Sequence, residues 1–259
     1  MTNALELSQA NLGYEGKTTV ADLNIQVPKG SILTLVGGNG SGKSTFLKTI
    51  AGLLPPVGGT VKVLGSAPGK QPLRISYHGQ FHPNSFLLPL RAIDVVRMAR
   101  FPARGLFGKI TSADEDIIYH ALAELDAVDL ANKPINALSG GQKQRVFLAH
   151  TLARQADLVL LDEPTAGLDV PGSELYDTMV RNLKTQGRTL VIATHSIKEA
   201  SSSDYVLLLA SRVVAFGQPK TVLSPANLLE TFGLVAQVAG DDLLIVDPHH
   251  GHDHPHEHS

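Results

Sequence analysis

Apolar and polar residues follow two different periods along this chain, and the change of period divides it into parts. Residues 4–27 alternate loosely and carry turn residues, which predicts two or three antiparallel strands. Residues 32–36 form an apolar run without a polar face, as expected of a strand that is buried on both sides. Similar runs return at 158–161 and 189–194, each flanked by helical patterns. This order is typical of βαβ units and predicts a parallel sheet.

Between residues 85 and 154 the pattern becomes helical. Residues 112–115 read as a capping box, which predicts a helix that begins there and runs to about Leu125. Ser139 can cap a further helix that ends near Leu152. We therefore expect an α/β fold in which a helical subdomain, at about residues 85–154, is inserted between strand-rich parts.

The C-terminal third continues the sheet and then loses its pattern. Residues 205–210 and 212–216 predict the last strands. A second capping box at 196–199 and the proline at 225 each predict the start of a helix. We expect one folded domain over residues 1–240, followed by a histidine-rich tail at 241–259.

The composition narrows the possible functions. The 259 residues are 43% hydrophobic and carry a net charge of -2, so the chain is globular and has no basic excess for nucleic acid. Cysteine is absent, which fits a reducing compartment. We find no signal peptide and no run near the roughly 20 apolar residues that span a bilayer. The chain is expected to be soluble and to reach a membrane only through a partner.

A glycine-rich segment follows the predicted strand at 32–36. Residues 37–44 read GGNGSGKS and match G-x-x-x-x-G-K-[ST], with a strand before and a helical pattern after them. Glycines let backbone N–H groups surround a phosphate, and the helix N-terminus adds partial positive charge. Lys43 would reach the β- and γ-phosphates and Ser44 would bind Mg²⁺. The predicted nucleotide-binding residues of this segment are Gly37, Gly38, Asn39, Gly40, Ser41, Gly42, Lys43, Ser44 and Thr45.

Two acidic residues end the apolar run at 158–161. A parallel strand delivers such residues to the sheet edge where ligands of α/β proteins bind, beside the glycine-rich segment. Asp162 would hold Mg²⁺ through its water shell, and Glu163 would polarise the attacking water. Two acids after a strand alone would fit an ordinary helix start, but the phosphate-binding motif favours the catalytic interpretation.

A third motif, LSGGQ, occupies residues 138–142. Its serine and glycines open a helix whose N–H groups face outward and can form a second anion site. The order of phosphate loop, LSGGQ and LLDEP resembles the ABC transporter ATPase family over roughly residues 4–233. The resemblance implies a P-loop fold with a parallel sheet, an antiparallel β subdomain and a helical subdomain. It also implies a homodimer, unless a different ATPase subunit replaces one copy. In that dimer Leu138, Ser139, Gly140, Gly141 and Gln142 of one subunit close over ATP held by the other.

The same resemblance assigns roles to four further residues. Tyr14 is similar to the aromatic residue that stacks on adenine, and Gln80 to the glutamine that contacts Mg²⁺ and senses the membrane subunit. Here Gln80 follows His78 and Gly79 rather than the usual proline. Asp169 matches the loop that contacts the opposite subunit. His195 matches the histidine that contacts the γ-phosphate, while the histidines at 78, 82, 120 and 150 are expected to be structural.

Cargo is indicated by two weaker features. Residues 99–107 with 111–114, and 213–219 with 223–227, resemble ATPases of zinc and manganese importers. The tail carries histidines that can chelate zinc, nickel or copper, and we interpret it as a local metal buffer or sensor. These histidines are His249, His250, His252, His254, His256 and His258. A solvated tail without function is the alternative interpretation.

The hypothesis is therefore an ATP-hydrolysing subunit that uses Mg²⁺ and powers import of zinc, or of manganese or iron. Its expected partners are polytopic permease subunits and a substrate-binding protein, at the cytoplasmic side of the membrane. Import of a non-metal cargo and a non-transport ABC ATPase remain alternatives. The latter usually carries coiled-coil insertions or fused cassettes, and the roughly 58 residues between Gln80 and Leu138 leave no room for long arms.

Overall fold

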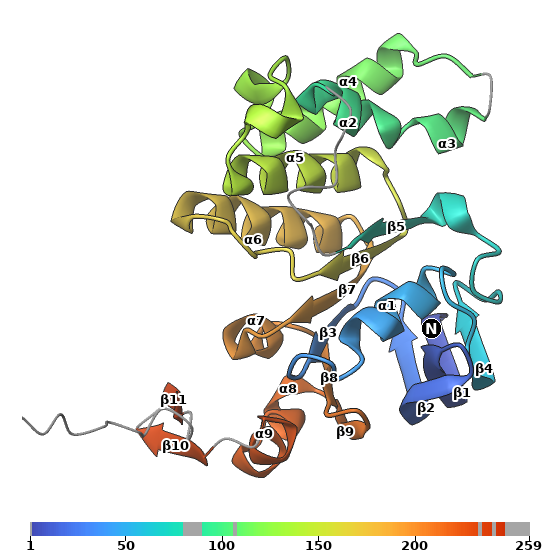
Figure 1. Ribbon diagram of the computed structural model, residues 1–259, viewed down its shortest axis with the longest axis vertical. Coiled ribbons are helices and arrows are strands. Elements are labelled where there is room, and N and C mark those ends of the chain that lie inside the picture. The colour runs from blue at the N-terminus through green and yellow to red at the C-terminus, as the bar shows by residue number, and fades with distance from the viewer. Residues whose placement is uncertain (1, 80–89, 106–107, 233–234, 240–241, 247–259) are drawn as a thin grey trace, which may run out of the picture.

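A six-stranded sheet forms the centre of the computed structural model, which describes residues 2–79, 90–105, 108–232, 235–239 and 242–246 (Figure 1). Adjacent strands are parallel except for the last pair, which is antiparallel. The strands in sheet order are β5 (Ile75–His78), β6 (Leu158–Asp162), β7 (Thr189–Thr194), β3 (Ile32–Val36), β8 (Tyr205–Leu209) and β9 (Val213–Gly217).

The parallel strands owe their place in the centre to their uniformly apolar sequences. Every residue of β3, β6 and β7 is buried, as the apolar runs predicted. Strands buried on both faces need helices or a second sheet on each side. Because these strands are parallel, their carboxyl ends lie along one edge, where the motifs at 37–44, 162–163 and 195 come together.

A second sheet packs on one face of the first. Its strands are β1 (Asn3–Tyr14), β2 (Lys17–Pro28) and β4 (Gly58–Val63), antiparallel in the order β2-β1-β4. Helix α1 (Lys43–Ile50) lies between the two sheets, with Phe46, Leu47 and Ile50 fully buried in the core that they share. This is the antiparallel subdomain expected from residues 4–27, with its third strand supplied from further along the chain.

The helical subdomain stands at the other end of the molecule (Figure 1). Its own core joins the face of β6 and β7 that the second sheet leaves uncovered. Its elements are α2 (Ala92–Met98), α3 (Phe101–Arg104), α4 (Ser112–Glu124), the 3₁₀ turns Val128–Leu130 and Ile135–Ala137, and α5 (Gly140–Ala153). Helix α5 begins after Ser139 as predicted.

The predicted cap of α4 was wrong by one residue. Thr111, and not Ser112, is the N-cap, and its hydroxyl accepts from the backbone N–H of Asp114. The reason is that the carboxylate of Asp114 turns back to Thr111, accepting from its backbone N–H at 2.9 Å and from its hydroxyl at 2.8 Å. Two of the four segments that resemble metal-importer ATPases, 99–107 and 111–114, meet here, because Arg100 and Arg104 also bind this buried carboxylate.

The remaining elements cover the sheet and extend the chain beyond it. They are α6 (Val170–Thr185), α7 (Ile197–Ser201), α8 (Pro219–Val222), α9 (Pro225–Phe232), the 3₁₀ turn Pro72–Arg74, and the hairpin β10 (Val235–Ala239) with β11 (Asp242–Val246). The hairpin was not anticipated, and it spans the domain boundary expected at 240–241. Only one of the two hydrogen bonds of the second capping box forms. The Ser196 hydroxyl accepts from the N–H of Glu199, but the Glu199 carboxylate accepts from Tyr176 of α6 and not from the backbone of Ser196.

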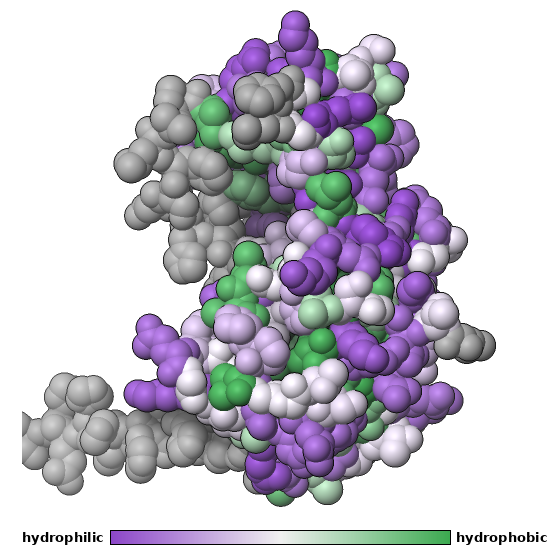
Figure 2. Space-filling model, turned by 90° about the vertical axis from the view of Figure 1, so that its right-hand side faces the viewer, coloured by the Kyte–Doolittle hydropathy of each residue, from purple (hydrophilic) through white to green (hydrophobic). Residues whose placement is uncertain are grey.

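The surface does not offer a broad apolar area on the face drawn in Figure 2, where hydrophobic residues lie scattered among hydrophilic ones. Within the described ranges, no helix combines the length and apolar character needed to cross a bilayer.

Candidate functional site

The loop between β3 and α1 contains two glycines, Gly37 and Gly42, that no other residue could replace without displacing a neighbour. At Gly42, φ is +105°, and a Cβ atom would lie 2.2 Å from Cγ2 of Val20. At Gly37, a Cβ atom would lie 2.1 Å from the carbonyl oxygen of Leu209. At these two positions the backbone passes so close to its neighbours that a side chain is excluded, and the loop wraps around the N-terminus of α1.

Lys43 places its ammonium group across this loop. Its Nζ atom donates to the carbonyl oxygens of Gly37 at 2.7 Å and Gly38 at 3.0 Å. Burial lowers the pKa of Lys43, while the nearby carboxylates of Glu163 and Asp162 oppose that shift. The buried hydroxyl of Ser41 has no hydrogen-bond partner among the described residues. A cation, a helix N-terminus and an unpaired hydroxyl at one loop form a site for an anion with several oxygens.

A cleft of about 520 Å³ opens above the loop. Its rim includes Tyr14, a residue that is 40% exposed and whose ring centroid lies 5.8 Å from the ammonium of Lys48. The cleft is lined by Tyr14, Thr19, Asn39, Gly40, Ser41, Gly42, Lys43, Ser44, Thr45 and Glu163. The structure thus brings together residues from β1, the glycine loop, α1 and the end of β6 that the sequence had linked only by motif.

Asp162 ends β6 and is 3% exposed. Burial raises its pKa, whereas a hydrogen bond with Ser44 acts in the opposite direction. Tyr77 of β5 also bonds to Asp162, and its own pKa is raised by burial and then by this carboxylate. Tyr77 was not found from the sequence, because a tyrosine inside a short strand carries no motif.

The pair of Ser44 and Asp162 fits Mg²⁺ in its chemistry. Mg²⁺ usually takes one or two protein oxygens and completes its shell with phosphate oxygens and water. Across the part of the chain that the structure describes, no group of three His, Cys, Asp or Glu side chains is placed to hold a metal alone. A metal here would thus depend on the nucleotide for its remaining ligands.

Glu163 and His195 meet at the ends of adjacent strands. Glu163 has a φ of +51°, a left-handed conformation that is strained for a residue with a side chain, and its N–H donates to the carbonyl of Ala193. Its Oε1 atom lies 2.7 Å from Nε2 of His195. Since an ionised carboxylate only accepts, the imidazole Nε2 is the donor.

A second cleft, of about 230 Å³, lies at the start of α5. It is lined by Ser139, Gly141, Gln142, Arg145, Gly167 and Asp169. Ser139 is exposed and forms a complete capping box with Gln142, and a Cβ atom at Gly140 would meet nothing within 4 Å. Leu138 is different, since its side chain is 5% exposed and anchors the motif in the helical core. The helix end therefore points away from its own subunit.

The remaining predicted residues are Asp169, Gln80 and the histidines outside the ATP cleft. Asp169 is exposed and caps α6 by accepting from the N–H of Gly172 at 2.9 Å, a local role that the family resemblance did not indicate. His78 is buried and His150 is half-buried, as expected of structural histidines. Gln80, His82 and the six tail histidines at 249–258 lie outside the described residues.

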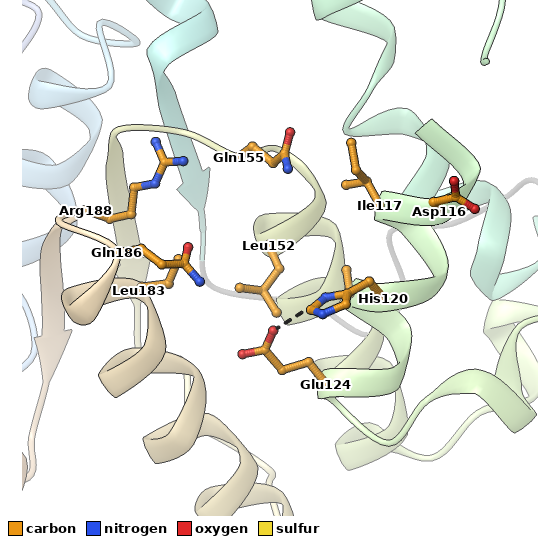
Figure 3. Close-up of a pocket in the computed structure, with 10 residues that line it drawn as sticks. Asp116, Ile117, His120, Glu124, Leu152, Gln155, Leu183, Gln186 and Arg188 are labelled. Carbon is orange, nitrogen blue, oxygen red and sulfur yellow. Dashed lines mark ion pairs between the residues drawn. The ribbon is translucent and has the colours of Figure 1, made fainter. Parts of the chain in front are cut away.

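A third cleft, of about 390 Å³, lies between the helical subdomain and α6, and no predicted site residue lines it (Figure 3). Asp116, His120 and Glu124 of α4 face it from one side, and the end of α6 faces it from the other. An ion pair of 4.0 Å joins His120 and Glu124. This cleft holds none of the phosphate-binding or acidic motif residues.

Residues 20–166 match the family model described as ABC transporter. The chain belongs to the ABC transporter ATPase family. The match includes the phosphate loop, LSGGQ and the Asp162–Glu163 pair, so the resemblance expected from the sequence is confirmed. As a member of this family, the ABC ATPase binds ATP and couples its hydrolysis to transport.

Curated relatives cover most of the ABC ATPase. It is 36% identical over 230 residues to the manganese transport system ATP-binding protein MntB of Bacillus subtilis, covering 88% of this chain and 92% of the relative. It is 36% identical to the iron(3+)-hydroxamate import ATP-binding protein FhuC of the same organism, covering 92% and 91%. It is 33% identical to the zinc transport system ATP-binding protein TroB of Treponema pallidum, covering 89% and 87%.

Solved structures confirm the fold. A chain of an inward-facing transporter described as of the metal-chelate type superposes with a TM-score of 0.82 at 29% identity, covering 95% of the ABC ATPase and 98% of that chain. A dimeric ATP-binding cassette, MJ0796, in a post-hydrolysis state with ADP and Pi, gives a TM-score of 0.73 at 25% identity, covering 83% and 98%.

Proposed function

We propose that the ABC ATPase hydrolyses Mg·ATP in the cleft above Gly37–Ser44 and thereby powers uptake of a transition-metal ion, zinc first and manganese second. The ATP site is supported mainly by the Lys43 ammonium, which lies across the glycine loop. The same loop contains the buried Ser41 hydroxyl, which has no hydrogen-bond partner among the described residues. The observation that carries a dimer is the separate, outward-facing cleft at Ser139.

Each residue of the ATP cleft has a defined task in this proposal. Lys43 neutralises the β- and γ-phosphates, and exchanges its contacts with Gly37 and Gly38 for phosphate oxygens. Ser44 and Asp162 would hold Mg²⁺, which supplies charge neutralisation at the phosphates when bound. Tyr14 stacks on the adenine at the rim. The loop N–H groups of residues 38–45 position the triphosphate.

The water that attacks the γ-phosphate is oriented by Glu163. His195, at 2.7 Å, holds the Glu163 carboxylate and can turn toward the γ-phosphate. Gln80 is proposed to contact the metal and to report on the permease. Phosphoryl transfer of this kind depends mainly on positioning and on charge stabilisation.

Two subunits complete each site. The ATP cleft is open, and the Ser139 helix end lies in a different cleft of the same subunit. We infer a head-to-tail homodimer in which Ser139, Gly140, Gly141 and Gln142 of one copy face the phosphates in the other. Asp169, beside the second cleft, would contact the opposite subunit. Similarity to a dimeric cassette with ADP and Pi supports this arrangement.

The cargo is inferred from two observations. The relatives include ATP-binding proteins named for manganese and zinc transport, and the tail carries six histidines. FhuC, named for iron(3+)-hydroxamate import, makes a ferric chelate the third candidate after zinc and manganese. The partners would be polytopic permease subunits and a substrate-binding protein, with the ATPase bound at the cytoplasmic side of the membrane and without contact to nucleic acid.

A reconstituted transporter tests this proposal. The ABC ATPase is co-purified with its permease, placed in vesicles, and supplied with the binding protein loaded with Zn²⁺, Mn²⁺ or a ferric hydroxamate. We expect Zn²⁺ to stimulate ATP hydrolysis and to be transported, and Lys43→Ala to abolish both while the complex stays assembled. If only the ferric hydroxamate stimulates ATP hydrolysis, the cargo is a ferric chelate and not zinc. Absence of ATP hydrolysis under all conditions would overturn the ATPase assignment.

A further inference from the structure

A buried glutamine joins three segments that are far apart in the chain. Gln144 lies on α5 and is 4% exposed. Its Nε2 atom donates to the carbonyl oxygen of Pro164 at 2.6 Å and lies 3.1 Å from Nε2 of His78. Pro164 directly follows Glu163, and His78 ends β5, two residues before Gln80. A single side-chain amide therefore connects the LSGGQ helix, the hydrolytic strand end and the strand that leads to the predicted metal-contacting glutamine.

The hydrogen bond from Gln144 determines the protonation state and tautomer of His78. The amide nitrogen of glutamine only donates, so Nε2 of His78 accepts and the ring is neutral with its proton on Nδ1. Burial favours this neutral form, since it lowers the pKa of His78 to about 4, with a smaller contribution from His150. The ring also packs against Phe147 of α5, with a centroid distance of 6.4 Å. His78 thus contacts α5 through a hydrogen bond and through packing.

The bridge also has a defined position between the two clefts. Ser139 precedes Gln144 by five residues on one helix, which corresponds to about 7.5 Å along its axis. Pro164 is the residue after Glu163, which lines the ATP cleft. A displacement of α5 along its axis would accordingly act on the backbone beside Glu163 through one short hydrogen bond.

We propose that Gln144 and His78 are positioning residues that couple the two ATP sites of the dimer. When Ser139 of one subunit engages the ATP of its partner, α5 shifts, and the Gln144 bridge moves Pro164 and Glu163 into place over the subunit's own ATP. This inference rests on the proposed dimer, but it assigns a role to two residues that contact neither nucleotide. A glutamine that served only the packing of the core would affect folding stability and not the cooperativity of hydrolysis.

Four variants of the full-length ABC ATPase separate these roles. Gln144→Leu removes the donor, His78→Phe removes the acceptor but keeps a ring against Phe147, and His78→Gln restores an acceptor with similar reach. Gln186→Leu is the matched control, because Gln186 is exposed at the end of α6. Steady-state ATP hydrolysis gives kcat and the Hill coefficient, and a fluorescent ATP analogue gives the dissociation constant of the nucleotide.

We expect wild type and Gln186→Leu to show a Hill coefficient above about 1.5, and Gln144→Leu and His78→Phe to fall to about 1. Their kcat should fall roughly 10- to 100-fold while nucleotide affinity stays within about threefold. His78→Gln should recover most of both values. If Gln144→Leu does not fold, the two His78 variants decide the matter.

Two results would overturn the coupling. One is a Hill coefficient of 1 for the wild type, with hydrolysis intact, which leaves the proposed ATPase function standing. The other is unchanged cooperativity in the folded Gln144→Leu or His78→Phe variant. Loss of hydrolysis in the wild type itself would instead contradict the proposed function.

Discussion

The Nε2 atom of His195 lies 2.7 Å from the Oε1 atom of Glu163, across the ends of two adjacent parallel strands. The two residues are 32 positions apart in sequence, and the sheet alone brings them together. Glu163 adopts a left-handed φ of +51° and lines the ATP cleft. Glu163 therefore combines a strained backbone with a hydrogen-bonded carboxylate at a ligand cleft. This is the arrangement expected of a residue that is held in place for catalysis.

Substitution of Glu163→Gln should stop hydrolysis without preventing ATP binding. The amide keeps the size of the side chain but orients and polarises water less well, so kcat should fall at least about 100-fold. The variant should accumulate as an ATP-bound closed dimer, seen by gel filtration with Mg²⁺ and ATP. Glu174→Gln, exposed on α6, is the control and should behave as wild type. A normal rate of hydrolysis in Glu163→Gln would show that Glu163 is misassigned.

Removal of the histidine-rich tail should abolish binding of transition metals by the isolated ATPase. A chain that ends at Val246 lacks all six histidines of the segment from 249 to 258. Imidazoles in such a run chelate Zn²⁺ with modest affinity. Isothermal titration with Zn²⁺ should therefore detect binding to the full chain and none to the shortened one, at equal rates of ATP hydrolysis. Equal zinc binding by both chains would assign the metal to another part of the protein.

Asp114→Asn should destabilise the helical subdomain. The buried carboxylate accepts from Arg104 at 2.7 Å and from Arg100 at 2.9 Å, and the hydrogen bonds, above all that from Arg104, hold its pKa well below the usual range. Loss of one partner from a buried ion pair costs roughly 3 kcal/mol, measurable by urea unfolding at pH 7. Since the folded pKa lies below the unfolded value, this contribution is complete above about pH 4 and is lost as the pH falls toward the folded pKa.

Asp116→Asn provides the matched control for that measurement. Asp116 lies on the same helix but is exposed, so its effect should stay within about 0.5 kcal/mol. Equal stabilities of the two variants would show that the ion pair contributes nothing net.

Two histidines, the buried His78 and the half-buried His150, should make the protein less stable in mild acid. Burial lowers the pKa of His78 and of His150 to about 4, from the ordinary histidine value of 6.5. Between these values the unfolded chain binds protons that the folded chain does not, so the free energy of unfolding falls as the pH is lowered. From pH 7.5 to 5 each histidine should contribute a loss of about 2 kcal/mol. His150→Gln should reduce this slope, as measured by urea unfolding at pH 5 and pH 7.5. Equal slopes in the wild type and the variant would show that His150 does not contribute to it.

The sequence predicted the parts of the fold that depend on local pattern. The apolar runs became buried parallel strands, and the glycine motif became a loop at the N-terminus of α1, because both follow from the residues of one short segment. Contacts between distant segments could not be predicted in this way. The bond from Tyr77 to Asp162 and the bridge from Gln144 to Pro164 depend on how strands and helices pack.

Smaller errors in the prediction have the same origin. Thr111 replaces Ser112 as the cap of α4 because the carboxylate of Glu115, which the predicted box required, instead accepts from Arg97 of α2. Glu199 leaves the predicted capping box because Tyr176 of α6 offers it a buried hydroxyl at 2.5 Å. In both places a tertiary partner competes successfully with the local one.

The central claim is that Ser139 of one subunit closes over the ATP bound at Gly37–Ser44 of another. Because the chain has no cysteine, Asn39→Cys and Ser139→Cys can be introduced together, in the Glu163→Gln background, as the only thiols. With Mg²⁺ and ATP, mild oxidation should yield a disulfide-linked dimer on non-reducing gels, and without nucleotide it should yield little. A chain that stays monomeric under both conditions, or that forms the disulfide within one subunit, would contradict the account.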